Sequence, residues 1–120
     1  MRQVNDTVLS GLDTVSTNGS QLDTNQMINM SFHCTISDST AAGVFKLQAS
    51  NDVAPLGIGA QTFVVHNWVD IPNQSITMTT GLEQGILTLS EIAYRWVRAV
   101  YTETVPGTGT VIVNRFGLGA

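Results

Sequence analysis

The stretch Met27–Ile36, with the sequence MINMSFHCTI, decides the fold. Apolar and more polar side chains alternate along it, and a period of two residues is typical of a strand with one covered face. The expected core-facing positions are Ile28, Met30, Phe32, Cys34 and Ile36. We therefore expect a strand that lies on a core, with His33 directed to solvent.

Two more alternating runs follow along the chain. A strand is expected over residues 43–50, where Phe45 and Leu47 share the core side. Another is expected over residues 61–71, ending at Pro72 because proline cannot donate to the next rung of a sheet. Turn-forming residues separate these runs, as between the strands of an antiparallel sheet.

The longest late run covers residues 93–104 and has apolar residues on both of its sides. We expect both faces of this strand to be covered, with Trp96 and Val100 packed in the core on one side. Shorter strands are expected over residues 75–80, 86–90 and 110–116.

Seven to eight short strands without crossover helices predict an all-β fold. The expected architecture is a single-domain antiparallel β-sandwich, immunoglobulin-like or jelly-roll-like. The predicted structural core includes Phe32, Phe45, Leu47, Trp96 and Val100. Residues 1–25 are rich in Ser, Thr, Asn and Gly and are expected to form an extended N-terminal arm with room for a first strand, or to fray as many termini do. Residues 26–120 are expected to form the sandwich.

The chain carries little charge. Only 12% of its 120 residues are charged, five cations stand against nine acids, and Ser, Thr, Asn and Gln supply most of the polarity. Because phosphate binding needs clustered cations, we expect neither nucleic acid nor an anionic membrane surface as a partner. No apolar run reaches the roughly 18 residues of a spanning helix. The missing charge indicates surfaces made to lie against other protein.

The residue types of catalysis and metal binding are sparse. Cys34 is the single cysteine, so it is expected to be a buried small hydrophobe, without a disulfide or a thiolate zinc site. The adjacent His33 points to the opposite face of the same strand and cannot easily chelate with it. No nucleophile elbow or phosphate-binding loop occurs. We expect no enzyme activity, no cofactor and no metal.

The best expected contact for a ligand or partner is the segment around Trp68. An exposed Trp68 beside His66 and Asp70 could stack on a sugar, so a glycan stays open as a ligand. Arg98 would need a carboxylate or carbonyl partner if it is buried, and we interpret it as a structural clamp.

Four short segments carry a resemblance when taken together. They are Gly43–Asp52 (GVFKLQASND), Trp68–Pro72 (WVDIP), Tyr94–Tyr101 (YRWVRAVY) and Gly107–Val111 (GTGTV). The set resembles small β-sandwich proteins encoded in the structural gene modules of tailed bacteriophages, over residues 28–117. Members of that family are head decoration, fibre or tail components, and they have no catalytic residues to carry over. The resemblance implies a virion part.

The expected function is that of a capsid decoration (cement) protein, a homo-oligomer that binds the major capsid protein or other virion proteins. A carbohydrate- or receptor-binding module of a fibre or tail, and a tail or connector subunit, stay open as alternatives. The first twenty residues lack the basic-then-apolar pattern of a secretory signal, so we expect assembly into the virion in the host cytoplasm.

Overall fold

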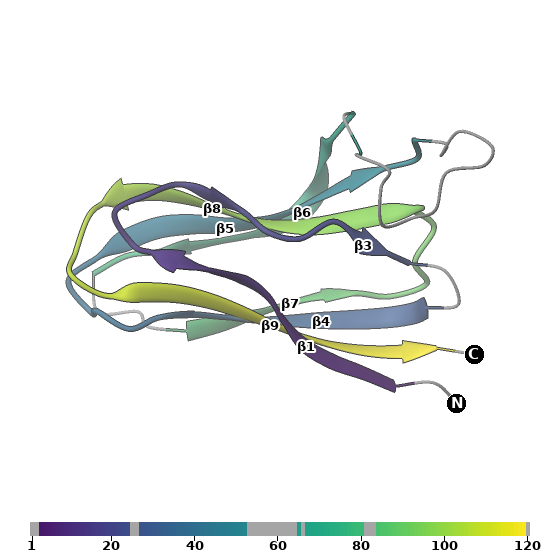
Figure 1. The fold of residues 1–120 in the computed structure, drawn as a ribbon, viewed down its shortest axis with the longest axis horizontal. Helices are drawn as coiled ribbons and strands as arrows, with labels where there is room; N and C mark the ends of the chain where they lie inside the picture. The colour runs from purple at the N-terminus through teal and green to yellow at the C-terminus, as the bar shows by residue number, and fades with distance from the viewer. Residues whose placement is uncertain (1–2, 25–26, 53–64, 66, 81–83, 120) are drawn as a thin grey trace.

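A computed structural model describes residues 3–24, 27–52, 65, 67–80 and 84–119. These residues form nine antiparallel strands in two sheets that pack face to face (Figure 1). The strands are β1 (Gln3–Leu12), β2 (Thr17–Asn18), β3 (Leu22–Asp23), β4 (Met27–Ile36), β5 (Ala42–Ser50), β6 (Val69–Met78), β7 (Gln84–Leu89), β8 (Trp96–Val105) and β9 (Thr110–Gly119). The all-β sandwich predicted from the sequence is confirmed. None of the described residues belongs to a helix that could cross a membrane.

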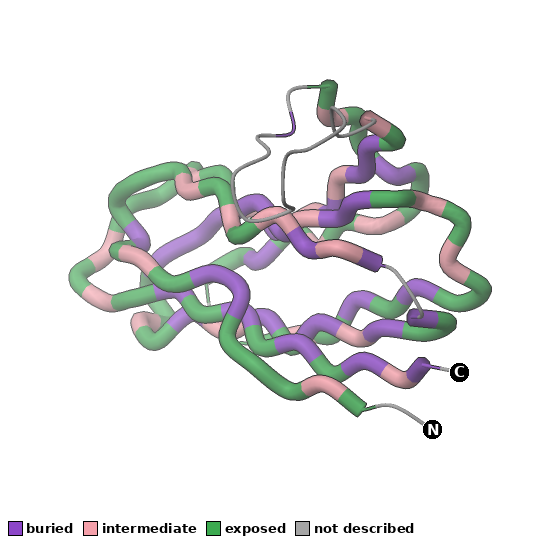
Figure 2. The backbone as a smooth tube through the Cα atoms, turned by 45° about the vertical axis from the view of Figure 1, so that its right-hand side comes forward, coloured by how far each residue is buried: buried purple, intermediate pink, exposed green. Residues whose placement is uncertain are grey.

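The four-stranded sheet has the order β1-β9-β4-β7, and the five-stranded sheet has the order β2-β8-β5-β6 with β3 also paired to β8. Figure 2 shows buried positions alternating with less buried ones along β9, the strand that leads to the C-terminus. The inner faces of the two sheets enclose a core in which Phe32, Phe45, Leu47 and Tyr101 are almost completely buried. The rings of Phe45 and Tyr101 lie 5.1 Å apart between their centroids.

Strand β4 has the bounds that the sequence predicts, but one of its core positions is wrong. Ile28 is 45% exposed, whereas Met27 is buried. The register with β9 shifts between Met27 and Asn29, and this bulge turns Ile28 outward. From Met30 onward the predicted alternation holds.

Strand β8 is covered on both sides, as predicted. Val97, Ala99 and Tyr101 face the core, and the alternating positions Trp96 and Val100 are buried on the outer side of the sheet, apart from the central cluster. The Trp96 indole donates a hydrogen bond to the carbonyl of Asp52 (3.1 Å). Trp96 and Val100 are thus buried outside the central cluster.

The prediction that a strand ends at Pro72 is wrong, because β6 continues through it to Met78. Proline is tolerated here since β6 is an edge strand, where a missing N–H breaks no ladder bond. Residues 71–74 stand opposite Leu47 alone and form a large irregular bulge, in which Asn73 has a φ of 62°. Residues 61–64 of the predicted strand lie outside the described residues.

The N-terminal segment that the sequence sets apart as an arm pairs with strands of the same chain. β1 lies against β9, and β2 and β3 lie against β8, so the segment crosses from one sheet to the other. Val8, Leu9 and Leu22 are buried in the core and hold it there. Burial of such side chains stabilises the packed arrangement by about 2 kcal/mol each.

Candidate interaction surfaces

Two of the three predicted contact residues lie on the outer side of the five-stranded sheet. Trp68 is half-buried and Asp70 is exposed, while His66 lies outside the described residues. The Arg98 guanidinium lies 4.5 Å from the centroid of the Trp68 ring. Two strands, β5 and β8, place the side chains that join these residues.

A chain of hydrogen bonds runs from Arg98 to Asp70. Arg98 Nε donates to Gln48 Oε1 (2.8 Å), and Gln48 Nε2 donates to Asp70 Oδ1 (2.8 Å). Lys46 Nζ lies 3.2 Å from the same carboxylate oxygen. We call Lys46, Gln48, Trp68, Asp70 and Arg98 the polar face.

The groups of the polar face satisfy one another. The hydrogen bond from Gln48, together with that from Lys46, lowers the pKa of Asp70. Partial burial lowers the pKa of Arg98. The partner of Arg98 is a carbonyl oxygen, which fits the clamp inferred from the sequence, and its guanidinium covers one side of the Trp68 ring. A sugar stacking on Trp68 would have only the other side.

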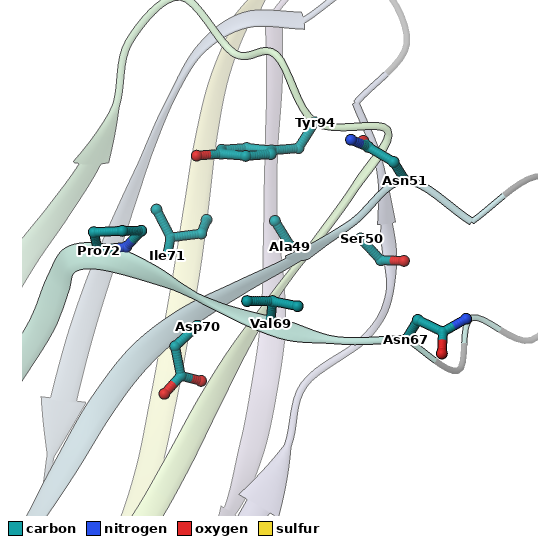
Figure 3. Close-up of a pocket in the computed structure, with 9 residues that line it drawn as sticks. All are labelled: Ala49, Ser50, Asn51, Asn67, Val69, Asp70, Ile71, Pro72 and Tyr94. Atoms are coloured by element: carbon teal, nitrogen blue, oxygen red, sulfur yellow. The ribbon is translucent and has the colours of Figure 1, made fainter.

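A pocket of about 250 Å³ lies beside this face, between the ends of β5 and β6 and the ring of Tyr94 (Figure 3). Ile71 and Tyr94 form its apolar wall, and the side chain of Asp70 points away from them. The side-chain amides at its rim are engaged elsewhere: Asn51 Oδ1 accepts from the Arg95 N–H (2.9 Å), and Asn67 Nδ2 donates to Asp52 (2.7 Å). This pocket therefore offers mainly apolar contact.

The nucleophilic and metal-binding groups are separated from one another. Cys34 is buried in the core, and this burial raises the pKa of its thiol to about 12. His33 lies on the opposite, exposed side of β4, with Nε2 3.0 Å from Gln84 Oε1. Across the described ranges, no group of three or more His, Cys, Asp or Glu side chains is close enough to hold a metal ion.

The outer side of the four-stranded sheet has a different character from the polar face. Opposite residues of neighbouring strands share a face, so the strand register defines its members. They are Gln3, Asn5, Thr7 and Ser10 of β1; Ile112, Asn114, Phe116 and Leu118 of β9; Asn29, Ser31, His33 and Thr35 of β4; and Gln84, Ile86 and Thr88 of β7. None of these described residues is Asp, Glu, Lys or Arg, and we call this surface the neutral face.

Large apolar side chains are exposed on the neutral face. Ile86 is 64% exposed, Phe116 40% and Ile112 37%. Beside Phe116, a hollow of about 290 Å³ extends over Ser31 and Thr88 to the end of β7. The face thus combines apolar protrusions with uncharged hydrogen-bonding groups, which is the chemistry of a protein contact.

The one charged residue of β9 turns away from the neutral face. Arg115 points inward and is 9% exposed. It makes a two-pronged ion pair with Asp6 of β1, at 2.8 Å from Nε to Oδ1 and 2.7 Å from Nη2 to Oδ2. No single strand displays the neutral face in its sequence, because the face depends on the strand order and on the inward orientation of Arg115.

The carboxylates of Asp13 and Asp38 bind the backbone of the Gly107–Val111 motif, and we call this arrangement the clasp. Asp13 is fully buried and accepts hydrogen bonds from the backbone N–H groups of Gly107 (3.2 Å) and Gly109 (3.0 Å). Asp38 accepts from the N–H of Thr108 (2.9 Å), and its bonds with Thr40 and Thr108 place its pKa well below its usual range. A Cβ on Gly107 would lie 2.6 Å from Asp38 Oδ2, so the close approach requires glycine. This motif serves the fold.

The comparisons with known proteins show the fold. No protein-family model matches the chain, and no curated protein sequence is significantly similar to it. Among solved structures, the chain is similar to the crystal structure of the SPBc2 prophage-derived protein YomS, with a TM-score of 0.59 and 15% sequence identity. The match covers 97% of this chain and 92% of that chain. The two proteins share the architecture of the whole domain.

Proposed function

We propose that this chain is a structural protein of a bacteriophage virion, and that it binds the capsid shell as a decoration protein through its neutral face. The observation that carries the proposal is the absence of charge over the described outer side of a whole sheet, combined with the exposure of Ile86, Ile112 and Phe116. A charged group that is covered by a partner must lose its water, which is unfavourable unless a matching charge meets it. A face without charge avoids this penalty.

The dimensions of the neutral face suit a protein contact. The sheet has four strands about 4.8 Å apart, three of ten residues and β7 of six, and it spans at most about 19 by 33 Å. This is roughly 600 Å², somewhat below the roughly 800 Å² that each partner contributes to a standard interface. Contact at the rim of the face would bring the area to the usual size.

Two lines of support point to a virion. The four segments from Gly43 to Val111 resemble bacteriophage structural proteins, and the fold is shared with a prophage-derived protein. A protein present in many copies on a shell also benefits from a surface that does not repel its neighbours. The chain carries a formal charge of −4, and none of it comes from the described residues of the neutral face.

The test is a comparison of capsids with and without the protein. Particles that lack it should lose resistance to heat and to osmotic shock, and the purified chain should restore this resistance. A Phe116→Asp variant should fail to restore it, whereas Trp68→Ala on the polar face should succeed. Unchanged resistance of particles without the protein would overturn the proposed role.

A receptor- or carbohydrate-binding module is the second candidate, and the half-buried Trp68 beside a row of polar side chains favours it. Its test is binding to a glycan array, with Trp68→Ala as the variant that abolishes binding. A tail or connector subunit would use the neutral face in the same way as a decoration protein. Locating the protein in the intact particle by electron cryomicroscopy distinguishes these roles.

A further inference from the structure

The edge strand β7 lacks the features that keep sheet edges from pairing. It runs over Gln84–Leu89 and pairs with β4 in a continuous register without a bulge. It contains no proline and no charged residue. Exposed edges of this kind have unpaired N–H and C=O groups and act as templates for a further strand.

The other edges of the described sandwich are protected. Strand β6 carries Pro72 and the large bulge around Asn73. Strand β1 has a register shift at Val8 and bears Asp6. Strands β2 and β3 are only two residues long. Bulges, proline, charge and short length are the usual means of blocking edge pairing, and β7 alone among the described edge strands has none of them.

We propose that β7 pairs with β7 of a second copy of this chain, antiparallel and across a twofold axis. The inference rests on the proposed function, since it describes how two copies of the chain would pair while their neutral faces contact the capsid shell. A second copy is the occupant that fits because two copies, each with a formal charge of −4, approach with least repulsion along β7, whose described residues carry no charge. A twofold contact also needs a self-complementary patch, and the β7 edge is such a patch.

A register centred on Ile86 satisfies the symmetry and keeps the neutral faces together. Ile86 lies opposite Ile86 of the second copy, and Gln84 lies opposite Thr88 of the second copy. Opposite residues share a face, so the exposed side chains of both copies stay on one side. The result is a continuous eight-stranded sheet whose neutral face is about 38 Å wide.

Cysteine cross-linking tests this register. In the pair, an Ile86→Cys variant places two thiols on adjacent strands at the twofold axis, near enough for a disulfide. An Ile112→Cys variant is the matched control, because Ile112 is exposed on the same face but lies on β9, two strands from the edge. The native Cys34 does not interfere, since it is buried with a raised pKa.

We expect sedimentation analysis to show a concentration-dependent species with twice the 12.8 kDa mass of the chain. Under mild oxidation, Ile86→Cys should form a covalent dimer, and Ile112→Cys should stay monomeric under denaturing conditions. Ile86→Lys should weaken dimerisation at least tenfold without changing the melting temperature by more than a few degrees. A chain that stays monomeric at every concentration, or cross-links through Ile112→Cys alone, overturns the proposal.

These outcomes separate the pairing from the proposed function. Phe116→Asp lies away from the edge, so it should dimerise normally and still fail to protect capsids. A monomeric chain that protects capsids would overturn the pairing and leave the decoration role standing. A dimer that cross-links through Ile86→Cys but does not act on capsids would overturn the decoration role and leave the pairing standing.

Discussion

The two outer faces of the sandwich differ in their charged and apolar side chains. On the polar face, the charges of Lys46, Asp70 and Arg98 are joined through Gln48 and the Trp68 ring. On the neutral face, the described residues carry no charge, and apolar side chains project into solvent. The small number of charges in the chain is therefore distributed unevenly between the faces.

This difference shows which face has its side chains satisfied within the chain and which face is available to a partner. The polar groups of one face have partners within the chain and add to its stability. The apolar groups of the other face find no cover among the described residues, so they gain free energy only when another surface covers them. Substitutions that separate stability from binding test this interpretation.

The largest effect is expected from Phe116→Asp on the neutral face. Covering an unpaired carboxylate should weaken binding to the shell by about 3 kcal/mol, or roughly a hundredfold. The melting temperature should change little, because Phe116 is partly exposed. Co-sedimentation with capsids measures the binding, and Thr104→Asp at the exposed C-terminal end of β8 is the control. Equal loss of binding in both variants would contradict the assignment of the neutral face.

Arg98→Ala on the polar face should have the converse outcome. It removes the contact with the Trp68 ring and the hydrogen bond to Gln48, and should lower the free energy of unfolding by about 1–2 kcal/mol. Binding to the shell should not change. Urea denaturation measures the stability, with Lys46→Ala as a comparison on the same face. Lost binding at unchanged stability would assign the function to the polar face instead.

Acid should destabilise the protein through its carboxylates. In the folded chain the pKa of Asp70 lies below its ordinary value of 3.8, so the folded state favours the charged form. The stabilisation is then fully present above about pH 4 and is lost as the pH falls further. Asp38 of the clasp acts in the same direction. Thermal melts below pH 4 should show a smaller acid response in Asp70→Asn; an identical response would contradict the network.

The smallest effect is expected from His33→Gln on the neutral face. The contact between His33 and Gln84 is exposed, so its removal should change stability by no more than about 0.5 kcal/mol. The same urea denaturation measures it. A loss above about 1 kcal/mol would show that hydrogen bonds on the neutral face support the fold, and would reduce the contrast between the faces.

The sequence predicts the strands whose alternation is local. Residues 27–36 and 43–50 show one covered face in the chain itself, and both form the expected strands. The errors at Ile28 and Pro72 lie at bulges. A bulge depends on how a strand meets its neighbour, and one strand's sequence does not contain that information.

The candidate surfaces depend on contacts between distant parts of the chain. Trp68 and Asp70 were predicted together, but Gln48 and Arg98, which join them, come from two other strands. The sequence contains the glycines of the Gly107–Val111 motif but not the reason for them. That reason is the close approach of the Asp13 and Asp38 carboxylates. Side chains brought together by strand order are visible only once the sheets are assembled.

The pairing of β1 with β9 has a consequence for the chain during its synthesis. Asp6 and Arg115, which join these strands by an ion pair, are 109 residues apart. Strand β1 therefore emerges from the ribosome long before β9, with which it pairs, has been synthesised. Polar side chains keep an unpaired strand hydrated and discourage premature association. The first part of β1 has four of them: Gln3, Asn5, Asp6 and Thr7. The β1–β9 seam can therefore close only after β9 has emerged.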